Sequence, residues 1–208
     1  MRIIVYGATG GLGQEVIAEG LAAGHTMTAF VRGPNARLPE HPRLRVVHGD
    51  ALQAHTVTQA IRDHDAVVSA LGVKTSRALR SPSTTISAAT RNIVNAMQQH
   101  HVPRLLFVSS FGVHQNVFWP EKLLLHTLLK NLFQDIPAQE ALIRGSTLDW
   151  TIIRPARLTS GPKTGTYRAN EHLNINPLSH ISRSDVADYI ISSIAKPETA
   201  HRTPVLSY

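Results

Sequence analysis

A glycine-rich segment between the first apolar run and the first amphipathic stretch constrains the fold more than any other feature. Gly7-Ala8-Thr9-Gly10-Gly11-Leu12-Gly13 directly follows the β-branched run 3–6, and apolar side chains then recur at helical spacing. Glycines at a strand-to-helix junction permit a tight turn, and they let backbone N–H groups approach a phosphate that the helix N-terminus attracts. A turn that is rich in glycine only for packing is the alternative.

Short β-branched runs alternate with helical patterns along the chain. Such alternation predicts a parallel sheet with helices on both faces, which is a doubly wound α/β fold. Because no Pro-, Gly- or Ser-rich linker divides the chain, we expect a single domain over 1–208, with a nucleotide-binding part of about 1–110 and an acceptor-side part of about 111–208. The predicted strands are 3–6, 27–31, 44–48, 66–70, 105–109, 150–154 and 205–207. The predicted helices begin near residues 12, 54, 81 and 182, the last one capped by Ser182.

The composition argues against several classes of protein and of site. The chain has 208 residues and no cysteine, so it lacks disulfides and thiolate metal sites and fits a reducing cytoplasm. No apolar run approaches the roughly 18 to 20 residues that a membrane span needs, and no basic-plus-apolar leader opens the chain. No histidine pair has a convincing metal-ligand spacing. We therefore expect a cytoplasmic protein with no membrane partner and no bound metal.

The net charge of +7 narrows the choice of ligand. Residues 66–120 contain no Asp or Glu, although basic residues continue through them, and a second basic cluster lies within 32–45. Nucleic-acid binders usually show a dense basic stripe or aromatics interleaved with basic residues, and this chain shows neither. We expect an anionic small molecule rather than nucleic acid, with a scattered solvated surface as the alternative.

The end of the second predicted strand indicates which dinucleotide would bind. An NAD site normally places Asp or Glu there, to accept a hydrogen bond from the ribose 2′-OH. Here the strand ends at Arg32, and Arg37 follows closely. Guanidinium groups suit a 2′-phosphate, to which they donate paired charge-assisted hydrogen bonds. We predict NADPH rather than NADH, the alternative being that both arginines are solvated loop residues.

Two further strand ends offer contacts to the same cofactor. Asp50 and Ala51 follow the third predicted strand, where an adenine ring would lie. Asp50 could accept from the exocyclic amine, although Asp after Gly is also ordinary turn chemistry. Ala70, Leu71 and Gly72 end the fourth predicted strand, and their small size would let the backbone run past the nicotinamide-side ribose.

Together, these segments resemble the atypical short-chain dehydrogenase/reductase superfamily, and within it the group of biliverdin reductase B and NADPH-dependent flavin reductases. The resemblance covers nearly the whole chain, and it implies a Rossmann-type fold, NADPH as hydride donor, and flavins or linear tetrapyrroles as acceptors. The motifs that carry it are GATGGLG at 7–13, VRGPNARL at 31–38, GDAL at 49–52, ALG at 70–72, ATRNIVNAM at 89–97, LLFVSS at 105–110 and LDWTIIRPARL at 148–158.

The resemblance also implies the site residues. Ser109 and Ser110 end the fifth predicted strand, where the family holds nicotinamide and substrate, and we expect Ser110 to be the catalytic candidate. Its alternative role is to cap the following turn. Phe111 and Arg157, the latter in the turn 154–157 after the sixth predicted strand, complete the predicted substrate-binding set with Ser110; Arg157 is equally plausible as a surface residue. The predicted cofactor-binding residues are Gly7, Thr9, Gly10, Gly11, Leu12, Gly13, Arg32, Arg37, Asp50, Ala51, Ala70, Leu71, Gly72 and Ser109.

The chain lacks the Tyr-x-x-x-Lys pair of the tyrosine-dependent relatives. Its tyrosines lie at 6, 167, 189 and 208, and none falls between 110 and 148, where that pair belongs. A flavin acceptor removes this difficulty, because stacking and orientation supply most of the catalysis without an obligatory protein proton donor. We therefore predict an NADPH-dependent reductase of FMN, riboflavin or a similar flat conjugated acceptor, with the flavin as substrate rather than as a tightly bound cofactor.

A non-catalytic role also fits the missing pair. Some NmrA-like relatives bind NADP(H) as redox sensors and regulate a partner protein. The short chain favours the reductase, because such sensors commonly carry additional C-terminal segments. For either function we expect a monomer or a homodimer.

Overall fold

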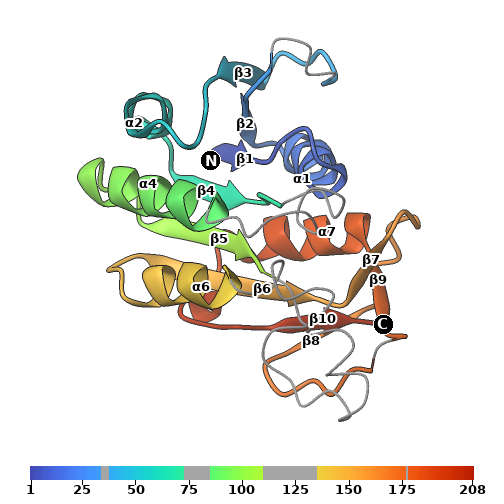
Figure 1. The fold of residues 1–208 in the computed structure, drawn as a ribbon. Coiled ribbons are helices and arrows are strands. Elements are labelled where there is room, and N and C mark those ends of the chain that lie inside the picture. Colours follow the sequence, from blue (N-terminus) through green and yellow to red (C-terminus); the bar gives the residue numbers. More distant parts are fainter. Residues whose placement is uncertain (34–37, 73–84, 110–134, 177) are drawn as a thin grey trace.

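Eight strands form one sheet within residues 1–33, 38–72, 85–109, 135–176 and 178–208, which the computed structural model describes (Figure 1). Their order is β3-β2-β1-β4-β5-β6-β10-β8, and β7 and β9 form a separate pair. The strands of the large sheet are β1 (Arg2–Tyr6), β2 (Thr26–Val31), β3 (Leu44–His48), β4 (Ala66–Ser69), β5 (Arg104–Val108), β6 (Asp149–Pro155), β8 (Arg168–Asn170) and β10 (Val205–Ser207); the pair consists of β7 (Arg157–Thr159) and β9 (His180–Ser182).

The strand order confirms the predicted doubly wound α/β fold, with one departure. From β3 across to β10 every neighbouring pair is parallel, whereas β8 pairs antiparallel with β10. The chain leaves β6 at the carboxyl ends of the parallel strands. From there β8 runs back toward the amino ends of these strands, so it pairs with β10 in the antiparallel direction. The sheet is therefore mostly, and not wholly, parallel.

Helices cover both faces of this sheet (Figure 1). Because successive side chains of a strand point to opposite faces, Val68 packs with the helices of one face and Val67 with those of the other. One apolar cluster joins the strands to α1 (Gly11–Ala22) and α7 (Arg183–Ser193), which pack against each other. The second cluster joins them to α2 (Ala54–Ile61), α4 (Thr85–Gln99) and α6 (Ile136–Arg144).

Most predicted elements lie where the sequence patterns put them. Strands 44–48 and 205–207 match their predicted bounds, and α2 begins at the predicted residue but ends at Ile61. The predicted helix start at 81–83 lies outside the described residues. The predictions did not include β7, β8, β9 and α6; a short 3-10 turn, η2 (Pro197–Thr199), precedes β10.

The start of α7 is fixed by a buried carboxylate. The Ser182 hydroxyl accepts from the Asp185 backbone N–H, as expected of an N-cap, and also donates to the Asp185 carboxylate at 3.0 Å. Burial alone would raise the pKa of Asp185, but hydrogen bonds from Tyr208, Gly165 and Thr164 outweigh it and hold that pKa at about 2. These contacts join residues 164–165 and Tyr208, which follows β10, to the N-terminus of α7.

Candidate functional site

The glycine loop between β1 and α1 leaves no room for a side chain at Gly7 or at Gly13. Gly7 has φ +82°, and a Cβ on it would lie 2.4 Å from the carbonyl oxygen of Ala70. A Cβ on Gly13 would lie 2.2 Å from the carbonyl oxygen of Gly7. The Gly10 backbone N–H donates to the same oxygen at 2.9 Å. The loop is thus packed closely against the residue that follows β4, so Gly7 and Ala70 lie side by side.

The N-terminus of α1 has no side chain that caps it. Its N-cap is Gly10, which has no side chain to accept from the first N–H groups of the helix. Thr9, Gly10 and Gly11 are exposed, whereas Leu12 and Gly13 are buried in the core. An exposed helix N-terminus of bare backbone N–H groups fits the pyrophosphate of a dinucleotide, which binds through such groups and the helix dipole.

The parallel pairing places the remaining strand ends along one edge with the loop. Tyr6 is in register with Ser69, Ser69 with Phe107, and Val31 with His48. The residues that follow these strands therefore meet at the carboxyl edge of the sheet, where open α/β sheets bind their ligands. Among the predicted site residues described here, this edge collects the glycine loop, Arg32, Asp50, Ala51, Ala70, Leu71, Gly72 and Ser109.

The residues after β2 and β3 differ in their exposure and in the hydrogen bonds that they make within the protein. Arg32 directly follows β2 and is exposed, and Arg37 lies outside the described residues. The Asp50 carboxylate accepts from the Leu52 backbone N–H at 3.0 Å, which is the turn chemistry that the sequence left open as an alternative. The Ala51 carbonyl accepts from the Asn92 side chain of α4 at 3.0 Å. Asp50 thus has a local structural role whether or not it also contacts an adenine.

A buried carboxylate lies behind the end of β5. The Ser109 hydroxyl donates to Glu140 of α6 at 2.8 Å, and both Glu140 oxygens accept from Arg154 of β6, at 3.1 and 2.5 Å. Arg144 donates to the same carboxylate at 3.1 Å. Burial alone would raise the pKa of Glu140, but the hydrogen bonds from Arg154 and Ser109 outweigh it and lower that pKa. Glu140 is therefore a carboxylate anion inside the protein.

This cluster determines which hydrogen bonds Ser109 can offer to a ligand at the carboxyl edge of the sheet. A hydroxyl has one proton, and that of Ser109 is already donated to Glu140, so its oxygen presents lone pairs. Among the described residues, the end of β5 therefore carries a hydrogen-bond acceptor and no proton donor from this side chain. The catalytic candidate Ser110 and the substrate candidate Phe111 lie outside the described residues.

Two groups near the site escaped the sequence predictions. The first is the pair Glu140 and Arg154; an arginine inside an apolar strand needs a buried partner, and that signal was available for Arg154. The second is Arg183, whose Nε lies 3.0 Å from the position of a Cβ on Gly11. Nothing local in the sequence indicates that α7 begins beside the glycine loop.

The prediction that Arg157 lies in a turn is wrong. Residue 157 begins β7, which pairs in parallel with β9, so Arg157 is in register with His180. The pairing with β9 supplies the backbone hydrogen bonds that keep this segment extended. The Arg157 side chain is exposed.

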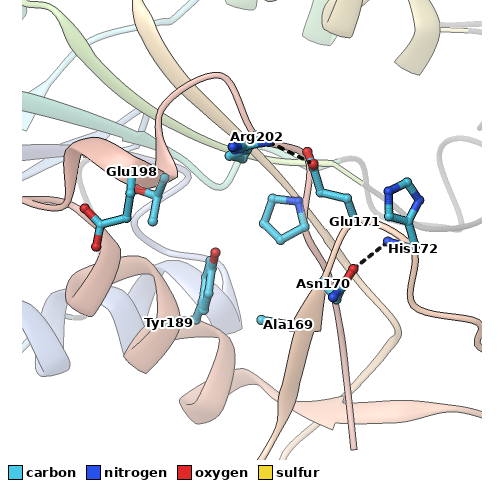
Figure 2. Close-up of a pocket in the computed structure, with 9 residues that line it drawn as sticks. Ala169, Asn170, Glu171, His172, Tyr189, Glu198 and Arg202 are labelled. Atoms are coloured by element: carbon cyan, nitrogen blue, oxygen red, sulfur yellow. Dashed lines mark hydrogen bonds and ion pairs between the residues drawn. The ribbon is translucent and has the colours of Figure 1, made fainter.

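The surface hollow with the lining drawn in Figure 2 lies away from this edge. It has a volume of about 270 Å³ and is formed around the residues that precede β10 and those that follow β8, at the amino ends of the parallel strands. Glu171, in its lining, is already engaged with Arg202 and with the Thr203 backbone N–H. The hollow is therefore not part of the candidate dinucleotide site.

The described parts of the chain lack two further features. No helix there has the length and apolar character to cross a membrane. Nor do those residues contain a group of three or more His, Asp or Glu side chains placed to hold a metal ion.

Residues 7–197 match the model of a protein family described as NAD(P)H-binding. The chain is also 24% identical to the photosystem II assembly factor Ycf39 of Synechocystis over 98% of this chain and 61% of that protein, so it spans less than two thirds of that relative's length. A short-chain dehydrogenase/reductase of Veillonella parvula in complex with NADP has TM-score 0.80 at 20% identity, covering 100% of this chain and 94% of the other. The anaerobilin reductase ChuY of Escherichia coli has TM-score 0.79 at 21% identity, covering 99% and 96%.

Proposed function

The chain belongs to the NAD(P)H-binding family and has the general character of an oxidoreductase, and from this premise we propose that it is a reductase that uses NADPH to reduce a flat conjugated acceptor such as a free flavin. When bound, NADPH supplies two electrons as a hydride, and a flavin acceptor completes its reduction with a proton from solvent. The acceptor is a substrate that binds and leaves.

The observation that carries the proposal is the state of the hydroxyl at the end of β5. Because Ser109 donates its proton to Glu140, it can accept from an amide group of a bound cofactor but cannot protonate a substrate oxygen. The sequence also lacks a Tyr-x-x-x-Lys pair. An acceptor that needs no protein proton donor suits this arrangement better than a simple ketone does.

We assign the parts of the cofactor to the residues that the carboxyl edge collects. The glycine loop, residues 7–13, and the N-terminus of α1 would hold the pyrophosphate, because Thr9, Gly10 and Gly11 are exposed and the N-cap Gly10 has no side chain to accept from the first N–H groups of the helix. Arg32 would bind the 2′-phosphate. Ala70, Leu71 and Gly72 would line the nicotinamide-side ribose, since no atom of the described residues lies within 4 Å of the position of a Cβ on Gly72.

A turnover assay tests the reductase. We expect the purified protein to oxidise NADPH in the presence of FMN or riboflavin, with saturable kinetics above the rate without enzyme. The decrease in absorbance of the reduced nicotinamide measures it, and heat-inactivated protein is the control. Tight NADPH binding without turnover on flavins, quinones or biliverdin would overturn the proposal.

That last outcome would favour the second candidate, a regulator that senses NADP(H) without catalysis. One relative is named as an assembly factor rather than as an enzyme, and the acceptor-only Ser109 suits cofactor binding as well as catalysis. Binding would then differ between NADPH and NADP⁺, which a titration with each would measure.

Charge reversal at the end of β2 tests the choice of cofactor. In Arg32→Glu we expect the Kd for NADPH to rise roughly tenfold to a hundredfold, because a charge-assisted hydrogen bond to the 2′-phosphate is replaced by repulsion. The Kd for NADH should stay nearly unchanged. Arg45→Glu, at an exposed position within β3, makes the same change of charge away from the strand end and is the matched control. Equal effects of Arg32→Glu on both cofactors would contradict the assignment.

A further inference from the structure

Arg183 lies against the glycine loop, although the two are far apart in the sequence. It is the first residue of α7 and is half-buried. Its Nε and Cδ lie 3.0 and 3.1 Å from the position that a Cβ on Gly11 would occupy, and its Cζ lies 3.7 Å from it. Even an alanine at position 11 would therefore have to displace this side chain by a few tenths of an ångström.

The guanidinium group of Arg183 has a neutral partner but no carboxylate among the described residues. Its Nη1 donates to the Ser160 hydroxyl at 3.0 Å. The acidic side chains nearest to it in sequence and in α1 are otherwise engaged, since Asp185 is enclosed by its own hydrogen bonds and Glu15 accepts from Ser184. A partly desolvated cation without a counter-charge is costly, so this arrangement favours the arrival of an anion.

The N-terminus of α1 adds to the same local field. Gly10 contributes no capping side chain, and the first turn of α1 contains no acidic residue. The partial positive charge of the helix N-terminus and the full charge of Arg183 therefore act on the same small region above Gly11. Neither feature is neutralised within the described part of the chain.

We propose that Arg183 binds the pyrophosphate of the dinucleotide at the N-terminus of α1, and that position 11 is glycine because the guanidinium group occupies the space of its side chain. The inference rests on the proposed assignment of the cofactor to this loop. The two arginines would then have different roles. Arg32 would bind the 2′-phosphate, which only NADPH carries, whereas Arg183 would contact the pyrophosphate, which NADPH and NADH share.

Binding measurements with four ligands distinguish these roles. In Arg183→Ala we expect the Kd values for NADPH, NADH and ADP-ribose to rise by the same factor, roughly tenfold to a hundredfold. Binding of adenosine 2′-monophosphate, which has no pyrophosphate, should not change. Arg183→Lys should recover part of the loss, because it keeps the charge without the planar fork. Thermal unfolding of the free protein checks that Arg183→Ala is folded.

A second variant tests the same contact without removing the arginine. Gly11→Ala places a methyl group against the Arg183 side chain, so we expect it to weaken NADPH and NADH binding severalfold and equally. In the Arg183→Ala background the same methyl group has nothing to displace, and it should then cost little further affinity. Full additivity of the two changes would contradict the proposed contact.

The outcomes separate this inference from the proposed function. If the wild type binds NADPH and Arg183→Ala leaves its Kd within twofold, the role of Arg183 is refuted while the cofactor assignment stands. A loss confined to NADPH would refute the pyrophosphate contact as well. If the wild type binds no dinucleotide at all, the proposed function fails first, and the inference fails with it.

Discussion

Gly13→Ala is expected to lose dinucleotide binding and to lower the free energy of unfolding by about 1 to 3 kcal/mol. The added Cβ would lie 2.2 Å from the carbonyl oxygen of Gly7, which is backbone and cannot rotate away. Either the N-terminus of α1 or the turn at Gly7 must therefore shift. Urea unfolding measures the stability, and titration with NADPH measures the binding.

A second glycine provides the control for this prediction. Among the described residues no atom lies within 4 Å of the position of a Cβ on Gly33, and Gly33 does not have a positive φ, so Gly33→Ala should leave stability nearly unchanged. If Gly13→Ala binds NADPH as the wild type does, the close approach of α1 to the loop does not constrain the site. The cofactor would then have to be sought elsewhere.

Glu140→Leu is expected to destabilise the protein by about 3 to 5 kcal/mol, the largest stability effect that we predict. The substitution leaves the guanidinium group of Arg154 buried without its carboxylate, and the Arg154 side chain is only 14% exposed. It also frees the Ser109 hydroxyl, so the end of β5 loses its fixed orientation. Urea unfolding of the variant, with the denaturant dependence compared with that of the wild type, checks the prediction.

Two further variants show whether the buried, unpaired charge is the cause of the lost stability. Glu140→Leu combined with Arg154→Met removes both charges, and we expect it to regain most of the lost stability. Arg2→Gln breaks an exposed pair with Asp65, with side chains 56% and 40% exposed, and should cost no more than about 1 kcal/mol. A double variant as unstable as Glu140→Leu alone would show that the loss comes from packing rather than from the uncompensated charge.

Elements with a strong local pattern could be predicted from the sequence. Buried strands such as β1 and β4 show as β-branched runs, and Ser182 followed by Asp185 marks the start of α7. By contrast, β8 has three exposed residues and no apolar alternation, and β7 and β9 are equally short. Their extended conformation depends on pairing partners that no local pattern reveals.

The residues of the candidate site also differ in whether the sequence could predict their positions. The glycine loop and Arg32 could be placed from the sequence because chain continuity alone sets them at the ends of β1 and β2. Glu140 and Arg183 could not, because their positions depend on how α6 and α7 pack on the sheet. An arginine within the apolar run of β6 was the one local sign that a buried acid must exist nearby.

The place of β10 in the sheet has a consequence for biosynthesis. β8 precedes β10 in the chain, yet within the described sheet β8 is joined only through β10, which itself pairs with β6. As the polypeptide leaves the ribosome, β8 therefore emerges before the strand that will hold it, and the edge of β6 stays open. Until β10 arrives, that edge can pair with another nascent chain, so slow translation between these two strands should favour misassembly.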